Sequence, residues 1–248
     1  MGFWPVVINL VRESDIIVLV GDVRMPELSR NKALEELISK FGKHLVSVFT
    51  KIDLVSDIYL EKIRNKYKDA FFVSGTRNIG INNLKIRLLI LAKRLKIKMP
   101  GIAIVGYPNV GKSAIINALV KRARAKVSAH AGTTRGIQWI KSSGFLLFDS
   151  PGVIPYNDGN IALGILGSKN PEKLNNVERV ADEIVKMFVN YDKNVLEEAY
   201  GIRVGEEYSN ILEEIAGKKG FLLKGGVVDE RRAALLILRD WQKGKLRL

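Results

Sequence analysis

Between residues 106 and 113 the chain reads Gly106-Tyr107-Pro108-Asn109-Val110-Gly111-Lys112-Ser113, which fits the pattern G-x-x-x-x-G-K-[ST]. The apolar residues 102–105 predict a buried strand before it, and residues 114–120 predict a helix after it. In a strand–loop–helix unit of this kind, backbone N–H groups and the helix N-terminus surround phosphate oxygens. The stretch therefore predicts a nucleoside triphosphate site.

Within this phosphate loop, two side chains have expected parts. Lys112 would reach the β- and γ-phosphates, and the hydroxyl of Ser113 would ligate Mg²⁺. The residues expected to contact the nucleotide phosphates are Asn109, Val110, Gly111, Lys112, Ser113 and Ala114.

Strand and helix patterns alternate over the first 150 residues. Strands are predicted at 15–21, 44–49, 70–73, 102–105, 136–142 and 145–149, and helices at 4–13, 31–41, 56–67, 81–96 and 114–120. Such alternation is typical of a doubly wound α/β sheet. Ligands of these sheets bind at the carboxyl ends of the strands, so the loops that follow the strands are where chemistry is expected.

The pattern changes after Gly152. Residues 153–170 have the composition of a loop, and helices are predicted at 177–191, 194–200, 206–216 and 229–242. We therefore expect an α/β domain over residues 1–159 and a small all-α domain over residues 160–248.

The charge of the chain is strongly positive, at +14 for 248 residues. Residues 1–159 hold 25 of the 40 Lys and Arg and 12 of the 26 Asp and Glu, so most of the excess lies there. The basic residues cluster around 85–98 and 121–126. This distribution suits a polyanionic partner such as RNA, but it is equally typical of a solvated Lys-rich surface.

Several classes of protein are disfavoured by composition. The chain has no Cys, which excludes disulfides and thiolate metal sites. No apolar run approaches the roughly 20 residues that span a bilayer, and the first residues do not resemble a signal peptide. We expect a cytoplasmic protein with no membrane partner, and a monomer.

Two further segments resemble the switches of P-loop GTPases. Asp149-Ser150-Pro151-Gly152 matches D-x-x-G, in which Asp149 would hold Mg²⁺ through water and the nucleotide would contact Pro151 and the N–H of Gly152. Thr134 takes the fourth place of a P-G-x-T-like segment in which Ala131 replaces Pro, and it would offer its hydroxyl to Mg²⁺.

Two other segments indicate the base. Thr50-Lys51-Ile52-Asp53 resembles N-K-x-D, and Ser74-Gly75-Thr76 resembles the S-A-x element beside the base. The carboxylate of Asp53 can accept from N1–H and the 2-amino group of guanine, whereas facing adenine it would stay unpaired at a cost of several kcal/mol. Thr50 departs from the usual Asn, so we expect guanine selection with reduced affinity. These residues predict binding of GTP and GDP.

The order of these segments is unusual. T-K-x-D and S-G-T precede the phosphate loop, whereas in ordinary GTPases they follow it. The sequence is therefore a circular permutation, and its D-x-x-G switch runs directly into the C-terminal domain.

The chain resembles the circularly permuted GTPases of large-ribosomal-subunit assembly, the YlqF/YawG group. The motif order matches, Asp22-Val23-Arg24-Met25-Pro26 is similar to their D-A-R-x-P, and residues 225–245 are similar to their closing G-G-x-x-D-x-x-R-A-A…D-W-x-x-G-K. The resemblance implies a P-loop GTPase that hydrolyses GTP while it binds and releases an immature large subunit through ribosomal RNA. Trp241 of the closing motif is interpreted as a core residue.

Some residues depart from the expected catalytic pattern. Val153 stands where Ras-type enzymes have a water-orienting Gln, so hydrolysis should be slow without a partner. The resemblance implies a catalytic His in an N-terminal G-H-M segment, but this chain has Trp4 there and no His. His130, in the switch loop, is a candidate catalytic aid. Asn109 resembles the phosphate-loop Asn that ligates K⁺ in similar GTPases, and a K⁺ there could replace an arginine finger.

Alternative functions remain open from sequence. A GTPase acting on another RNA, a nucleotide kinase and a GTP-binding RNA scaffold with little hydrolysis all contain a phosphate loop. Asp53 and the D-x-P-G switch disfavour the kinase, and residues 160–248 show no second catalytic site. The missing Gln and His keep the scaffold open.

Overall fold

The computed structural model describes residues 4–121, 129–130, 139–142, 144–155, 159–205 and 210–248. It divides the chain into two compact units. The first contains Met1–Asp53 and Asp57–Tyr156, and the second contains Leu54–Ser56 and Asn157–Leu248. The grouping of residues 54–56 with the second unit has no counterpart in the sequence pattern.

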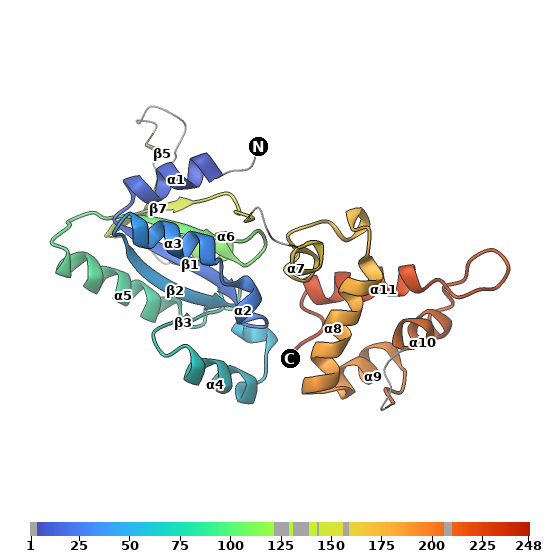
Figure 1. The fold of residues 1–248 in the computed structure, drawn as a ribbon. Coiled ribbons are helices and arrows are strands. Elements are labelled where there is room, and N and C mark those ends of the chain that lie inside the picture. The colour runs from blue at the N-terminus through green and yellow to red at the C-terminus, as the bar shows by residue number, and fades with distance from the viewer. Residues whose placement is uncertain (1–3, 122–128, 131–138, 143, 156–158, 206–209) are drawn as a thin grey trace. The chain divides into compact units, whose positions relative to one another are not determined.

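In the residues that the structure describes, a seven-stranded sheet forms the centre of the first unit (Figure 1), in the order β3-β2-β1-β4-β7-β6-β5. The strands are β1 (Ile16–Asp22), β2 (His44–Thr50), β3 (Phe71–Phe72), β4 (Gly101–Gly106), β5 (Ala129–His130), β6 (Trp139–Ser142) and β7 (Phe145–Asp149). The five strands from β3 to β7 along this order pair in parallel, and β6 runs antiparallel to both of its neighbours.

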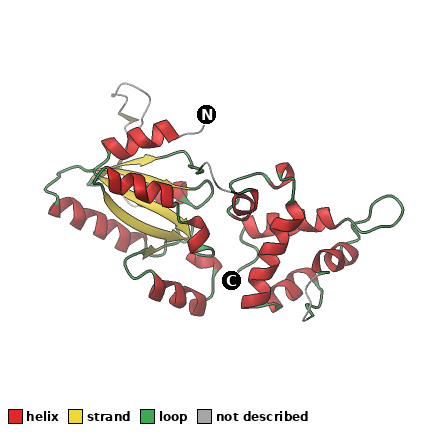
Figure 2. Cartoon of the chain, in the orientation of Figure 1, coloured by secondary structure: helices red, strands yellow, loops and turns green. Residues whose placement is uncertain are grey.

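Helices lie on both sides of this sheet (Figure 2). They are α1 (Trp4–Glu13), α2 (Pro26–Ser29), α3 (Lys32–Lys40), α4 (Asp57–Lys66), α5 (Ile81–Arg94) and α6 (Lys112–Lys121), with a 3-10 turn η1 at Ile52–Leu54. Every residue of β1 is buried, as expected for a central parallel strand with both faces covered. One face of β1 and β4 packs against the apolar sides of α1 and α3 in a single core cluster. The predicted doubly wound α/β fold is confirmed.

The second unit is built from helices in its described residues. They are α7 (Asn160–Ile165), a 3-10 turn η2 (Pro171–Lys173), α8 (Val177–Tyr191), α9 (Asn194–Tyr200), α10 (Ile211–Lys218) and α11 (Glu230–Gln242). Trp241 is fully buried, packs edge-on against Phe188 at 5.8 Å between ring centroids, and donates from Nε1 to the carbonyl of Ile165 at 2.9 Å. Trp241 is therefore a core residue, as interpreted from the sequence.

Five short elements of the described residues were not predicted, and two of them are the 3-10 turns η1 and η2. Residues 160–165, expected as loop, form α7, which buries Leu163 and Ile165, and α2 and β5 also lie outside the predicted elements. Helices and strands of two to six residues are too short to show a clear hydrophobic period, so tertiary burial decides them.

Candidate nucleotide-binding site

The strands β1, β2, β4 and β7 are parallel, so their carboxyl ends meet at one edge of the sheet. Their register places three pairs of residues side by side there: Asp22 and Thr50, Val20 and Gly106, and Ile104 and Asp149. The loops that follow β2, β4 and β7 carry predicted site residues, and the D-V-R-M-P segment lies at the end of β1. The topology thus brings together segments that lie far apart in the chain.

Lys112 is the first residue of α6, and its ammonium group folds back over the phosphate loop. Its Nζ donates to the carbonyl oxygens of Tyr107 at 2.7 Å and Gly106 at 3.3 Å. Burial lowers the pKa of Lys112 from 10.5 to about 8, although the negative charge of Asp149 acts in the opposite direction. A buried ammonium group at the N-terminus of a helix strongly attracts an anion.

Ser113 and Asp149 lie in direct contact beside Lys112. The hydroxyl of Ser113 donates to Oδ2 of Asp149 at 2.6 Å. A hydroxyl and a carboxylate placed together are oxygen ligands of the kind that Mg²⁺ prefers.

The residues after Asp149 lie against the phosphate loop. A Cβ at Gly152 would come within 2.5 Å of the backbone nitrogen of Pro108, so only glycine permits this approach. The N–H of Val153 donates to the carbonyl of Gly106 at 3.1 Å. The predicted switch segment and the phosphate loop therefore share one surface.

Thr50 connects the T-K-x-D segment to β1 and to the phosphate loop. Its hydroxyl oxygen lies 3.2 Å from the carbonyl oxygen of Gly21 and also contacts the carbonyl of Val110 in the phosphate loop. Lys51 has a left-handed backbone conformation with φ of 62°. Asp53 follows in the turn η1 and is partly exposed.

The S-G-T element lies beside these loops. The N–H of Ile52 donates to the carbonyl of Val73 at 3.5 Å, and the hydroxyl oxygens of Ser74 and Thr76 are 3.1 Å apart. A Cβ at Gly75 would come within 2.7 Å of the backbone carbonyl carbon of Ala114 in α6. The base-side segments and the phosphate loop are therefore packed together.

The remaining predicted site residues are Thr134, His130, Asn109 and Pro151. Thr134 lies outside the described residues. His130, expected in a loop, belongs to the strand β5, where its backbone pairs with Trp139. Asn109 is exposed and has a left-handed backbone with φ of 61°, and Pro151 is partly buried.

Two residues that hold the switch segment were not found from sequence. The side chain of Asn31 donates to the carbonyl of Val153 at 3.2 Å, and the indole of Trp4 donates to the carbonyl of Ile154 at 3.0 Å. Asn31 also caps α3 by accepting from the N–H of Leu34 at 3.1 Å. The position of Asn31 before a helix signals only the cap.

Comparisons with known proteins agree with this geometry. The family model described as RsgA GTPase matches residues 7–157, and the model described as 50S ribosome-binding GTPase matches residues 101–219. An uncharacterised GTP-binding protein of Methanocaldococcus jannaschii is 37% identical over 97% of this chain and 65% of its own length. Nuclear/nucleolar GTPase 2 of Arabidopsis thaliana is 32% identical over 98% of this chain and 43% of its own length. The chain thus spans less than two thirds of the length of these relatives.

Solved structures share the fold across both units. The GDP-bound structure of YlqF is 25% identical, with a TM-score of 0.65, and the match covers 97% of this chain and 95% of that one. GNP-bound YlqF from T. maritima has 23% identity and a TM-score of 0.63, with 98% and 94% covered. With the guanine-side segments ahead of the phosphate loop in the chain and beside it in space, the protein belongs to the RsgA GTPase family of circularly permuted P-loop GTPases.

Proposed function

We propose that this chain is a GTP-binding and GTP-hydrolysing switch that assists assembly of the large ribosomal subunit. The observation that carries the nucleotide part is the placement of Lys112 and the Ser113–Asp149 pair on one phosphate loop. A buried ammonium group and two oxygen ligands at a helix N-terminus suit a triphosphate with its metal.

The residues present fit Mg²⁺. Ser113 and Asp149 would hold it, with Thr134 from the switch loop. Bound Mg²⁺ would neutralise charge on the β- and γ-phosphates. The chain's own contribution is the Lys112 ammonium group, which supplies a fixed positive charge in a buried site where electrostatic interactions are stronger than in water.

Base selection rests on Asp53. Asp53 lies in η1 beside the S-G-T element, and the N–H of Gly75 would border the base. Guanine supplies two donors to one carboxylate, whereas adenine supplies neither, so GTP and GDP are the proposed ligands.

Hydrolysis by the chain alone is proposed to be slow. The side chain of Val153 is 1% exposed and packs in the core with α1 and α3, so it cannot orient a water molecule. We propose that a K⁺ ion held by Asn109 assists, since a cation near the β- and γ-phosphates stabilises the charge that develops between them. His130 is a second candidate aid.

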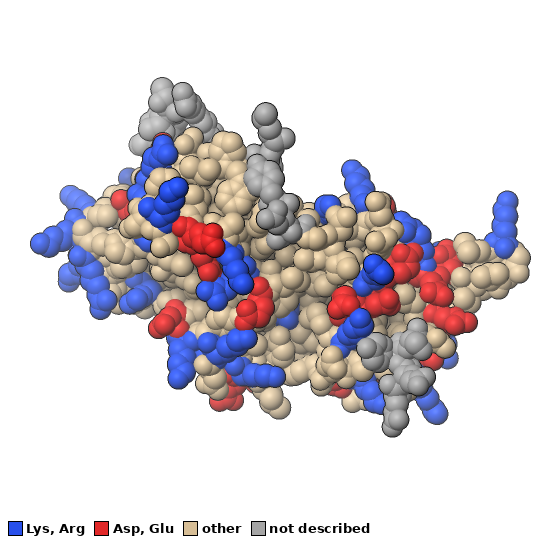
Figure 3. Space-filling view, viewed as in Figure 1, with Lys and Arg blue, Asp and Glu red and all other residues tan. Residues whose placement is uncertain are grey.

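The partner is proposed to be the large ribosomal subunit and its RNA, contacted by residues 160–248 and by the basic end of α5. Lys and Arg side chains gather over the region of α5 in the space-filling view (Figure 3). The exposed ones on α5 and after it are Arg87, Lys93, Arg94, Lys96 and Lys98. Relatives named as nucleolar GTP-binding proteins and the matched 50S ribosome-binding family model support this partner. We propose that the protein is a cytoplasmic monomer. In the described residues no helix has the length and apolarity needed to span a membrane.

The test is GTP turnover with and without purified large ribosomal subunits, in K⁺ and then in Na⁺ buffer. Stimulation by large subunits is expected, together with faster turnover in K⁺ that an Asn109→Ala variant loses. GTP binding without stimulation by large subunits would refute the assembly function and favour another RNA partner. Small subunits serve as the control, since they offer ribosomal RNA of a different fold.

The burial of Val153 favours one alternative, a GTP-binding RNA scaffold with little hydrolysis. The two are separated by single-turnover kinetics on the complex with large subunits. A scaffold would retain bound GTP there, whereas a switch would convert it to GDP and dissociate.

A further inference from the structure

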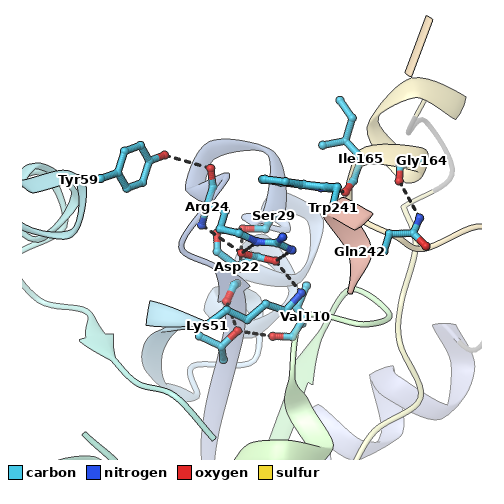
Figure 4. A network of polar contacts seen from close by, with 12 residues as sticks. Asp22, Arg24, Ser29, Lys51, Tyr59, Val110, Gly164, Ile165, Trp241 and Gln242 are labelled. Atoms are coloured by element: carbon cyan, nitrogen blue, oxygen red, sulfur yellow. Dashed lines mark hydrogen bonds and ion pairs between the residues drawn. The ribbon is translucent and has the colours of Figure 1, made fainter. Parts of the chain in front are cut away.

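Asp22 and Arg24, the charged residues of the D-V-R-M-P segment, form a buried ion pair at the end of β1 (Figure 4). Their side chains are each 2% exposed. Nη2 of Arg24 lies 2.9 Å from Oδ2 of Asp22, and Nε lies 3.1 Å from Oδ1. The pairing is bidentate, which fixes the plane of the carboxylate as well as its position.

A second cation shares this carboxylate. Nζ of Lys51 lies 2.7 Å from Oδ2 of Asp22, and the backbone N–H of Arg24 donates to Oδ1 at 3.1 Å. Each carboxylate oxygen therefore accepts from two donors. Although burial alone would raise the pKa of Asp22, the positive charges of Arg24 and Lys51 outweigh burial and lower the pKa to about 2. Asp22 stays ionised at every pH at which the protein would work.

The backbone on either side of the ion pair is held as well. The N–H of Asp22 donates to Oγ of Ser29 at 2.9 Å, and the hydroxyl of Tyr59 in α4 donates to the carbonyl of Arg24 at 3.0 Å. Both contacts fix the backbone on either side of the ion pair. Asp22 is therefore a rigid anchor, set by the register directly beside Thr50 at the end of β2.

Lys51 is the residue for which such an anchor matters. Its backbone is in the left-handed region, which is unfavourable for a residue with a side chain and persists only when the surroundings impose it. The side chain extends from this turn toward Asp22 rather than into solvent (Figure 4). Asp53 lies two residues further along the same turn, so the conformation of Lys51 sets where the Asp53 carboxylate points.

We propose that Asp22 and Arg24 are positioning residues for guanine recognition, which act by anchoring Lys51 so that the T-K-x-D turn presents Asp53 to the base. This rests on the proposed binding of guanine nucleotides. Arg24 aligns the carboxylate, the carboxylate holds Lys51, and Lys51 holds the turn. Loss of the anchor leaves the half-buried ammonium group of Lys51 without its carboxylate partner and releases the left-handed turn.

The ratio of the affinities for GDP and inosine diphosphate measures how well Asp53 recognises guanine. Inosine lacks the 2-amino group from which Asp53 would accept a hydrogen bond. The wild-type chain should therefore bind GDP at least about tenfold more tightly than inosine diphosphate, which is the expected effect of one hydrogen bond to a charged acceptor. In Asp22→Asn we expect weaker GDP binding and a ratio of the two affinities near one. A purely structural loss would weaken both ligands equally and leave the ratio unchanged.

Matched variants complete the experiment. Lys51→Met keeps the Asp22–Arg24 pair and the length of the side chain, so the variant should fold. It should also bring the ratio of the affinities for GDP and inosine diphosphate near one. Adding Asp22→Asn to Lys51→Met should change this ratio no further. Glu35→Gln breaks another ion pair of the same unit, with Arg30 at 2.6 Å, and should leave the ratio intact. Arg24→Lys, which keeps the charge but not the bidentate geometry, should lower the ratio partway.

Three results would overturn the inference. A folded Asp22→Asn chain with the wild-type ratio would do so, and so would a flattened ratio in Lys51→Met but not in Asp22→Asn or Arg24→Lys. A wild-type chain that binds GDP and inosine diphosphate equally would remove the assignment of Asp53 to guanine and this inference with it. The first two results leave the proposed GTP binding untouched.

Discussion

Replacing Lys112 with Met should stabilise the nucleotide-free protein while abolishing nucleotide binding. Lys112 is charged and buried, and its pKa falls from 10.5 to about 8 because of that burial. At 1.36 kcal/mol per pH unit, keeping it charged at pH 7 costs about 3 kcal/mol. Met removes this cost but also removes two hydrogen bonds to carbonyls, together worth about 1–2 kcal/mol. The expected net gain is about 1–2 kcal/mol in free energy of unfolding.

The pH dependence identifies the cause. Between pH of about 8 and 10.5 the unfolded chain holds a proton on Lys112 that the folded chain has released, so wild-type stability rises with pH across this window. The penalty is complete below pH 8 and disappears toward pH 10.5. The advantage of Lys112→Met should therefore be largest at pH 7 and smallest at pH 10.

Urea unfolding of the nucleotide-free protein at both pH values provides the measurement. Lys62→Met, an exposed change on α4, is the control and should alter neither value. A Lys112→Met chain that is less stable than wild type at pH 7, or whose advantage does not shrink by pH 10, would refute the reasoning. Mg²⁺ with GDP should stabilise the wild type and not the variant.

Three further predictions concern packing. Trp241→Phe leaves the carbonyl of Ile165 without its indole donor, so the second unit should lose about 1–3 kcal/mol of stability in urea unfolding, and an unchanged midpoint would contradict this. Asn31→Ala removes both the cap of α3 and the donor to the switch backbone, and should cost about 1–2 kcal/mol, whereas Asn31→Asp should keep the cap and lose only the second bond. Gly152→Ala places a Cβ 2.5 Å from the nitrogen of Pro108, so it should displace the switch and reduce GTP turnover more than GDP affinity; equal losses would argue against a switch role.

The sequence predicted the parts of the site that depend on strand ends. The phosphate loop is contiguous, so its strand–loop–helix setting could be recognised directly. The contact between Ser113 and Asp149 was predictable because both follow parallel strands, whose carboxyl ends meet at one edge. Sheet topology converts a one-dimensional order of motifs into a cluster.

Contacts made by side chains across long separations were not predictable. Asn31 and Trp4 reach the switch backbone over 122 and 150 residues, and nothing in their local pattern indicates this. Asp22 shows the same limit in milder form. Its segment was noticed only through a resemblance, whereas its contact with Lys51 depends on the register of β1 with β2.

The circular permutation gives the N-terminal helix a role that sequence order conceals. Val153, which follows the switch, is buried in one cluster with Val7, Leu10 and Val11 of α1. The helix α1 is thus packed against Val153, the first residue after the D-x-x-G segment of the nucleotide site. Any movement of the switch that exposed Val153 would give up about 1.5 kcal/mol or more of apolar burial and the hydrogen bonds from Asn31 and Trp4. In the proposed GTPase cycle, a nucleotide that drives such a movement must supply at least that difference in binding free energy between the two states, and the packing of Val153 against α1 contributes to this threshold.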